Sequence, residues 1–130
     1  MVDFKTKEQS MAQKAFLRVS ERQAESDFGD YKSFALSFPS LIHTCGLVQA
    51  VSFACSKKKK KSSMNKYVED LQAVFNEIDN AGDLATRSRE AMVMEYMRIS
   101  RHALSAASWI KRYCQAAPDK KEGEKVAELS

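Results

Sequence analysis

Residues 84–117, LATRSREAMVMEYMRISRHALSAASWIKRYCQAA, contain neither a glycine nor a proline. Their small and apolar side chains recur three or four positions apart, at Ala91, Met94, Met97, Ala103, Ala106, Ala107, Ile110 and Cys114. This period places them on one face of a helix. The segment is therefore predicted to be helical, as one helix or as two if Ser100 caps a separate last helix. A helical segment of this length favours an all-α fold.

The composition of the whole chain agrees with that fold class. The 130 residues are enough for one domain with one modest core. Only 4 glycines and 2 prolines interrupt the chain, too few for a fold of many strands and turns. No apolar run approaches the roughly 18 residues of a membrane span, and the N-terminal residues lack the apolar region of a signal peptide. We expect a cytoplasmic protein.

The first half of the chain is predicted to form three helices. The first covers about residues 5–25 and ends at a turn over residues 26–30. Its predicted buried face comprises Ala12, Ala15, Phe16 and Val19. A short helix follows over residues 31–38, because proline disrupts a helix interior and Pro39 suits the first turn of a new helix. That new helix reaches about residue 56 and contains Gly46. A glycine there permits close approach of another helix or marks a kink.

A further helix is predicted over residues 64–80, with Asn80 to Asp83 as its stop. Ser62 or Ser63 is a candidate cap for its first turn. Its buried stripe comprises Tyr67, Leu71, Val74, Phe75 and Ile78. The complete prediction is a single compact bundle of five to six helices over residues 1–117, followed by a flexible, charged tail over residues 118–130.

The residues that usually carry chemistry form no recognisable active site. His43 and His102 are far apart, and Cys45, Cys55 and Cys114 belong to no metal-binding spacing. No glycine-rich phosphate loop is present. A hydrolase would need a pocket that joins one histidine to a carboxylate and a nucleophile. We expect no enzyme activity, no cofactor, no bound metal and no small-molecule substrate.

Positive charge is the most pronounced local feature, within a net charge of +4. A run of five lysines comprises Lys57, Lys58, Lys59, Lys60 and Lys61. Five like charges repel one another, so the run is predicted to be a loop. It is either merely solvated or a contact for phosphates. A second feature is the stripe of Lys14, Arg18 and Arg22, spaced four apart on the first helix.

The third basic feature lies in the last helix. Arg101 and Arg112 are eleven positions apart, close to three turns, so they share a face. Lys111 adjoins Arg112, and Trp109 and Tyr113 are neighbours four apart. Two interpretations are open: core aromatics with solvated bases beside them, or a groove in which the arginines follow a nucleic-acid backbone and a ring stacks on a base.

Three stretches together carry a resemblance to a known family. They are QSMAQKAFLRV at 9–19, FPSLIHTCGLVQAVSF at 38–53, and YMRISRHAL at 96–104 continuing to WIKRY at 109–113. Their order and spacing resemble the small subunit of Cmr-type (type III-B) CRISPR effector complexes. Cys45 stands where the family usually has asparagine.

The resemblance implies a compact domain of about six helices without nuclease activity. It implies copies that stack head-to-tail beside other Cmr effector subunits and line the channel that holds CRISPR guide RNA paired to target RNA. By motif it supports Lys111 and Arg112 as RNA contacts. Lys14, Arg18, Arg101 and the lysine run are candidates from charge and helical phase alone. The alternative is a helical protein–protein adaptor without a nucleic-acid role.

Overall fold

The computed structural model describes residues 5–58, 61–79 and 82–118. These residues form six helices and no strand, so the predicted all-α class is confirmed. In chain order the helices are α1 (Lys7–Gln23), α2 (Phe28–Cys45), α3 (Leu47–Lys58), α4 (Ser62–Phe75), α5 (Leu84–Glu90) and α6 (Val93–Ala116). The tail predicted over residues 118–130 lies outside the part described except for residue 118, and it stays a prediction.

The first helix begins at a reciprocal cap. The side chain of Thr6 accepts a hydrogen bond from the Gln9 amide at 3.0 Å, and the Gln9 side chain accepts one from the Thr6 amide at 2.9 Å. This arrangement satisfies two backbone donors at the start of α1. The buried face of α1 is narrower than the sequence predicted. It includes Ala15 and Val19, whereas Phe16, expected on the same face, is 50% exposed.

Helix α2 is one continuous helix, so the predicted break at Pro39 is wrong. The turn predicted over residues 26–30 is present but lies earlier, over residues 24–27, and does not include Gly29. Gly29 lies in the first turn of α2, and Pro39 lies in its interior. A proline there removes the hydrogen bond to the carbonyl of Ala35. Pro39 is itself buried, as are Phe38 and Ile42 on either side of it. The packing of this apolar face offsets the missing hydrogen bond and keeps the helix intact.

The break falls at Gly46, and the helix predicted over residues 39–56 is therefore the end of α2 and most of α3. Gly46 has φ of 85° and ψ of 161°, a conformation that is essentially restricted to glycine. Its amide donates to the Ile42 carbonyl at 2.8 Å. Directly after it, the amide of Val48 donates to Tyr96 Oη on α6 at 3.1 Å. Gly46 thus turns the chain at a point where α6 lies close.

The lysine run is not simply a loop. Helix α3 continues into it as far as Lys58, and Lys61 is the N-cap of α4; residues 59–60 lie outside the part described. Neither serine of the pair 62–63 caps α4, because both lie within the helix. The hydroxyl of the first instead donates to Asp27 at 2.9 Å.

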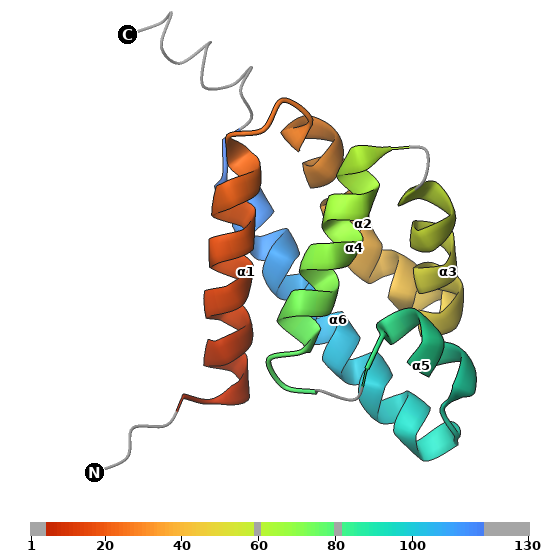
Figure 1. Cartoon of the computed structure of the whole chain (residues 1–130). Coiled ribbons are helices and arrows are strands. Elements are labelled where there is room, and N and C mark those ends of the chain that lie inside the picture. Colours follow the sequence, from red (N-terminus) through yellow and green to blue (C-terminus); the bar gives the residue numbers. More distant parts are fainter. Residues whose placement is uncertain (1–4, 59–60, 80–81, 119–130) are drawn as a thin grey trace, which may run out of the picture.

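Residues 84–117 form two helices, but the boundary is at Met92 and not at the predicted Ser100. Asp83 caps α5 by accepting from the Thr86 amide at 3.1 Å. Ala91 and Met92 are extended, and α6 starts after them. The change of direction lets α5 pack beside α3 while α6 crosses behind α1 and α4 (Figure 1).

The core lies between α6 and the helices around it. Ile99, Ala103 and Ile110 of α6 are fully buried. Of the stripe predicted for the helix at 64–80, Tyr67, Leu71, Val74 and Phe75 are buried on α4. Ile78 is partly buried but lies beyond α4, which ends at Phe75, earlier than predicted. Within the described ranges, no helix combines the length and the apolar character that crossing a membrane requires.

Candidate nucleic-acid interface

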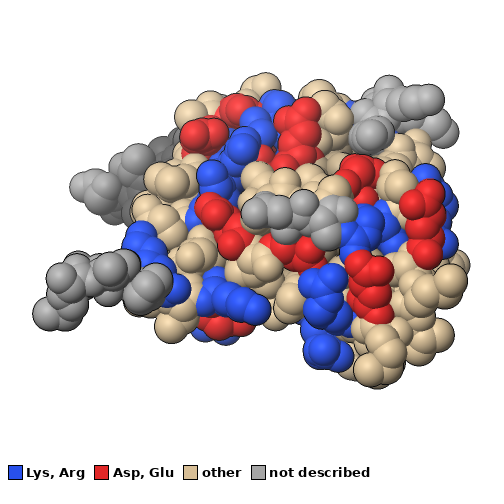
Figure 2. Space-filling view, turned by 60° about the horizontal axis from the view of Figure 1, so that its bottom comes forward, with Lys and Arg blue, Asp and Glu red and all other residues tan. Residues whose placement is uncertain are grey.

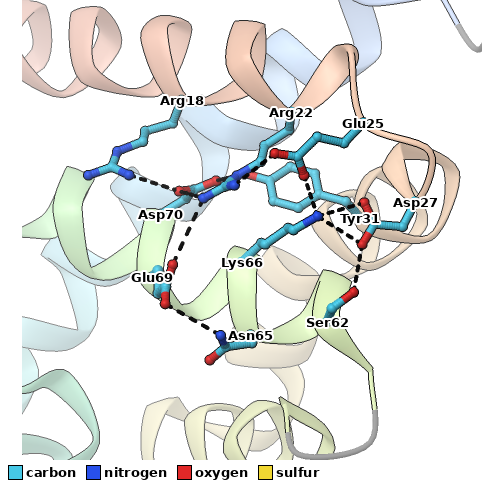
Figure 3. A network of polar contacts seen from close by, with 10 residues as sticks. All are labelled: Arg18, Arg22, Glu25, Asp27, Tyr31, Ser62, Asn65, Lys66, Glu69 and Asp70. Carbon is cyan, nitrogen blue, oxygen red and sulfur yellow. Dashed lines mark hydrogen bonds and ion pairs between the residues drawn. The ribbon is translucent and has the colours of Figure 1, made fainter.

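The basic stripe of α1 faces acidic residues of α4 and the segment after it. Figure 3 shows this contact for Arg18 and Arg22. Arg22 Nε lies 2.9 Å from Asp70 Oδ2, and its Nη2 lies 3.0 Å from Oδ1. Arg18 Nη1 is 3.5 Å from the same carboxylate. Lys14 Nζ is 3.7 Å from Glu77 Oε1. These three cations are therefore partly neutralised inside the protein and have less charge to offer to phosphates than the sequence suggested.

Asp70 is the centre of this network. Its side chain is fully buried, and it also accepts a hydrogen bond from Tyr31 Oη at 2.7 Å. The bond from Arg22 is bidentate, the strongest geometry for such a pair. The hydrogen bonds with Asp70 raise the pKa of Arg22, and burial raises the pKa of Tyr31, so both stay protonated. The network joins α1 and α2 to α4.

A second group of ion pairs extends the network to the turn between α1 and α2. Lys66 pairs with Glu25, and its Nζ lies 3.0 Å from Asp27 Oδ1 (Figure 3). Hydrogen bonds from Lys66 hold the pKa of Glu25 and that of Asp27 below their ordinary values. These contacts fix the turn on α4, and they leave Lys66 with a structural role.

The cations of α6 differ from those of α1. Arg101 and Arg112 are exposed and Lys111 is partly exposed. Among the residues that the structure describes, none of the three takes part in an ion pair. Arg112 Cζ lies 5.4 Å from the centre of the Trp109 ring, within the range of a cation–π contact. The unpaired α6 cations, Arg101, Lys111 and Arg112, are thus available to a phosphate backbone.

Aromatic residues beside the unpaired α6 cations pack against one another across α1 and α6. Trp109 and Tyr113 stack with their ring centres 6.0 Å apart, which confirms that they are neighbours. Phe16 meets Tyr113 edge-on at 5.5 Å. Trp109 Nε1 donates to Glu8 Oε2 at 2.6 Å. No pattern in the sequence indicated the contact of Glu8 or that of Phe16 with α6, because both residues are distant from α6 along the chain.

The lysine run is described only in part. Lys57 Nζ lies 5.5 Å from the ring centre of Phe53, which is 45% exposed. Lys61 is exposed. The side chains at 58–60 lie outside the part described, so a phosphate contact by this run stays a prediction.

Charge is mixed on the face that Figure 2 shows. Lysines and arginines alternate there with aspartates and glutamates and do not gather into one area. On this face, a polyanion would meet repulsion as well as attraction. The attraction of a polyanion would therefore depend more on the exposed cations without acidic partners than on the net charge.

One histidine does meet a carboxylate. His102 Nδ1 lies 3.5 Å from Asp79 Oδ2, but Arg98 Nη1 lies 2.5 Å from the same oxygen. Across ranges 5–58, 61–79 and 82–118, no group of three His, Cys, Asp or Glu side chains is placed to hold a metal ion. The Asp79 group is an ion-pair cluster between α6 and the segment that follows α4.

Four large apolar residues are exposed at the start of α6. Met92 is 82%, Val93 73%, Met94 81% and Met97 51% exposed. We name these four residues the methionine face. A group of large apolar side chains in contact with water is typical of a surface that binds another protein.

Fold and surface together define a small all-α protein with unpaired cations and a stacked aromatic pair on its last helix. The chain matches the family described as "CRISPR-associated protein (Cas_Cmr5)" over residues 7–117. It is 37% identical to the "CRISPR system Cmr subunit Cmr5" of Thermus thermophilus, over 86% of this chain and 96% of that protein. The chain therefore belongs to the Cmr5 family.

A solved structure agrees with this assignment. The crystal structure of a CRISPR-associated Cmr5 family protein, also from Thermus thermophilus, superimposes with a TM-score of 0.78 at 36% identity. The match covers 87% of this chain and 98% of that one. The fold is thus shared with an experimentally determined relative.

Proposed function

We propose that this chain is the non-catalytic small subunit of a type III-B RNA-guided effector complex in the cytoplasm, where it contacts the backbones of guide and target RNA in antiviral defence. Family membership supports the assignment to the complex. The observation that carries the RNA contact is the group of unpaired α6 cations.

The chemistry of those cations suits a subunit that does not read sequence. A lysine or arginine that meets a phosphate releases a counterion, and this gain is the same for every base. In an RNA-guided complex, base pairing between guide and target supplies the sequence specificity. Backbone contacts from α6 are then sufficient for the subunit's task, and the task includes no bond breaking.

The partners we propose are other Cmr effector subunits and copies of this chain. The methionine face supports protein contact at the start of α6. Phe16 and Leu17, which are 50% and 46% exposed, form a second apolar surface on α1, near the far end of α6. Two different surfaces at opposite ends favour a head-to-tail row, because such a contact does not close on itself.

The test of the RNA contact is charge reversal on α6. The variant Lys111→Glu/Arg112→Glu, assembled with the other subunits, is expected to bind RNA more weakly than the unmodified protein. The slope of log affinity against log salt should fall by about one for each phosphate that the variant no longer neutralises. Filter binding over a salt series measures both quantities.

The matched control makes the same change in net charge at two exposed cations that lie outside α6 in the sequence. Lys5 and Arg89 are exposed and have no ion pair within the described part of the chain. The variant Lys5→Glu/Arg89→Glu should bind RNA nearly as well as the unmodified protein. Equal losses in both variants would indicate a general effect of net charge. An RNA affinity that changes neither with salt nor in either variant would favour the protein–protein adaptor.

A further inference from the structure

A hollow of about 280 Å³ lies between the first turn of α1 and the second half of α6. It is lined by Glu8, Leu104, Ser105, Ser108, Trp109 and Arg112. Its volume is close to the lower end of the range for small-molecule sites, about 300 Å³. An aromatic ring, an arginine and two hydroxyls therefore converge on a space of the size that a small planar group requires.

The indole ring in this hollow is held in place before any ligand arrives. Glu8 accepts its N–H at 2.6 Å, which fixes the orientation of the ring edge. Tyr113 stacks on Trp109, and Phe16 supports Tyr113 edge-on. A ligand that stacks on Trp109 therefore does not have to order the ring, and this lowers the free-energy cost of binding.

Arg112 is the cation of the site and has no acidic partner among the residues that the structure describes. It is exposed, and its Cζ lies 5.4 Å from the Trp109 ring centre, farther than a tightly stacked pair. A guanidinium group without an acidic partner can move away from the ring and stack on the other face of a planar ligand. It then also places a positive charge beside any phosphate attached to that ligand.

Ser105 and Ser108 supply the polar groups of the lining. Each hydroxyl can donate one hydrogen bond and accept others. Hydroxyls that rotate freely can pair with a donor or an acceptor, so they do not select one base over another. The site therefore combines stacking with hydrogen bonding that tolerates any base.

We propose that the Trp109 hollow binds an unpaired nucleobase of single-stranded RNA, stacked between the indole ring and the Arg112 guanidinium. This inference rests on the proposed RNA contact and makes it more specific. Bases inside a guide–target duplex already stack on their neighbours, so only an unpaired or displaced base can occupy the hollow. Contact between the α6 cations and the RNA backbone does not require an unpaired base.

The experiment uses the chain's single tryptophan, Trp109, as its own reporter. The full chain is titrated with a short single-stranded RNA, with an abasic strand of the same length, and with the matching RNA duplex. Only the intact single strand should quench the fluorescence strongly. It should also bind about tenfold more tightly than the abasic strand, because stacking on an aromatic side chain contributes that much per base.

A variant separates stacking from charge. Trp109→Leu, measured by anisotropy of labelled RNA, should bind intact and abasic strands equally well while it keeps its salt dependence. Trp109→Phe retains a smaller ring and should keep part of the preference, with circular dichroism and thermal melting confirming that both variants fold.

The outcomes distinguish the two proposals. Equal affinity of the unmodified chain for intact and abasic strands, without quenching, would overturn the stacked base and leave the backbone contact standing. Failure to bind either strand, in the isolated chain and in the assembled complex, would contradict the RNA contact and the stacked base together.

Discussion

At the scale of single residues, Asp70 is the charge on which the fold depends most. It is fully buried on α4 and joins Arg22 and Tyr31, from two other helices, through hydrogen bonds of 2.7 to 3.0 Å. A buried carboxylate is costly unless it is paired. Here the donors of both residues are aimed at it, so removing the charge leaves Arg22 without its main partner.

We predict that Asp70→Asn lowers the free energy of unfolding by about 3 to 5 kcal/mol, the usual cost of breaking a buried ion pair. Denaturant unfolding measures this change. The control is Glu77→Gln, which breaks the more exposed pair with Lys14 and should cost less than about 1 kcal/mol. A loss at Asp70 no larger than that at Glu77 would show that the network contributes little to stability.

The sequence predicted neighbours along a helix but not partners from elsewhere. Trp109 and Tyr113 are four apart, and their stacking follows from that spacing. The pairing of Arg22 with Asp70 joins positions 48 apart, and no local pattern indicates it. For this reason the α1 stripe looked as available as the α6 cations until the structure placed Asp70 beside it.

At the scale of helices, Gly46 sets the boundary between α2 and α3. A Cβ atom at this position would meet only Tyr96 Oη, at an ordinary contact distance of 3.5 Å. Space therefore does not require glycine there; the φ of 85° does. Gly29, in contrast, lies in the first turn of α2 with open space around its Cβ position.

We predict opposite effects from the same substitution at these two glycines. Gly46→Ala should destabilise the protein by about 1 to 3 kcal/mol, because alanine is strained in that backbone conformation. Gly29→Ala should be neutral or stabilise it by up to about 1 kcal/mol, because alanine favours the helix. Thermal and denaturant unfolding of the two variants test this pair, and a stabilised Gly46→Ala variant would contradict it.

Helices with strong apolar periodicity were predictable, whereas their boundaries were not. The buried stripe of α4 follows directly from the spacing of Tyr67, Leu71 and Val74. The breaks depended on tertiary packing. Pro39 stays inside α2 because its surroundings are buried, and α6 begins after Met92 without a side-chain cap. Ser100 had the chemistry of a cap but lies within α6.

At the scale of the whole molecule, the two exposed apolar surfaces lie far apart. The methionine face is at the start of α6, at the lower right of Figure 1, and α1 with Phe16 and Leu17 lies on the opposite side. Helix α6 has 24 residues, so its ends are about 36 Å apart. One chain cannot bring these surfaces together, but two chains can.

We predict that the chain self-associates head-to-tail and that one charge on either surface stops it. Met94→Asp and Leu17→Asp should each be monomeric at concentrations where the unmodified protein forms longer species. An equal mixture of the two variants should form dimers and nothing longer. Each variant keeps one of the two surfaces, so one chain of each kind can pair, and the dimer has no intact surface left. Sedimentation velocity measures these sizes.

Gln49→Asp, an exposed position on α3, is the control and should assemble normally. If only one of the two charged variants were monomeric, the contact would join like surfaces and would close as a symmetric dimer. An unmodified protein that stays monomeric at every concentration would contradict the predicted head-to-tail self-association.

The central claim, that α6 faces RNA in the assembled complex, is tested most directly by site-specific photocross-linking. Gln115 is exposed one turn beyond Lys111 and Arg112, and Gln49 is exposed on α3. A photoreactive phenylalanine derivative replaces each glutamine in turn. We predict a strong cross-link to guide or target RNA from position 115 and a weak one from position 49. Equal cross-links, or RNA captured only from position 49, would contradict the account.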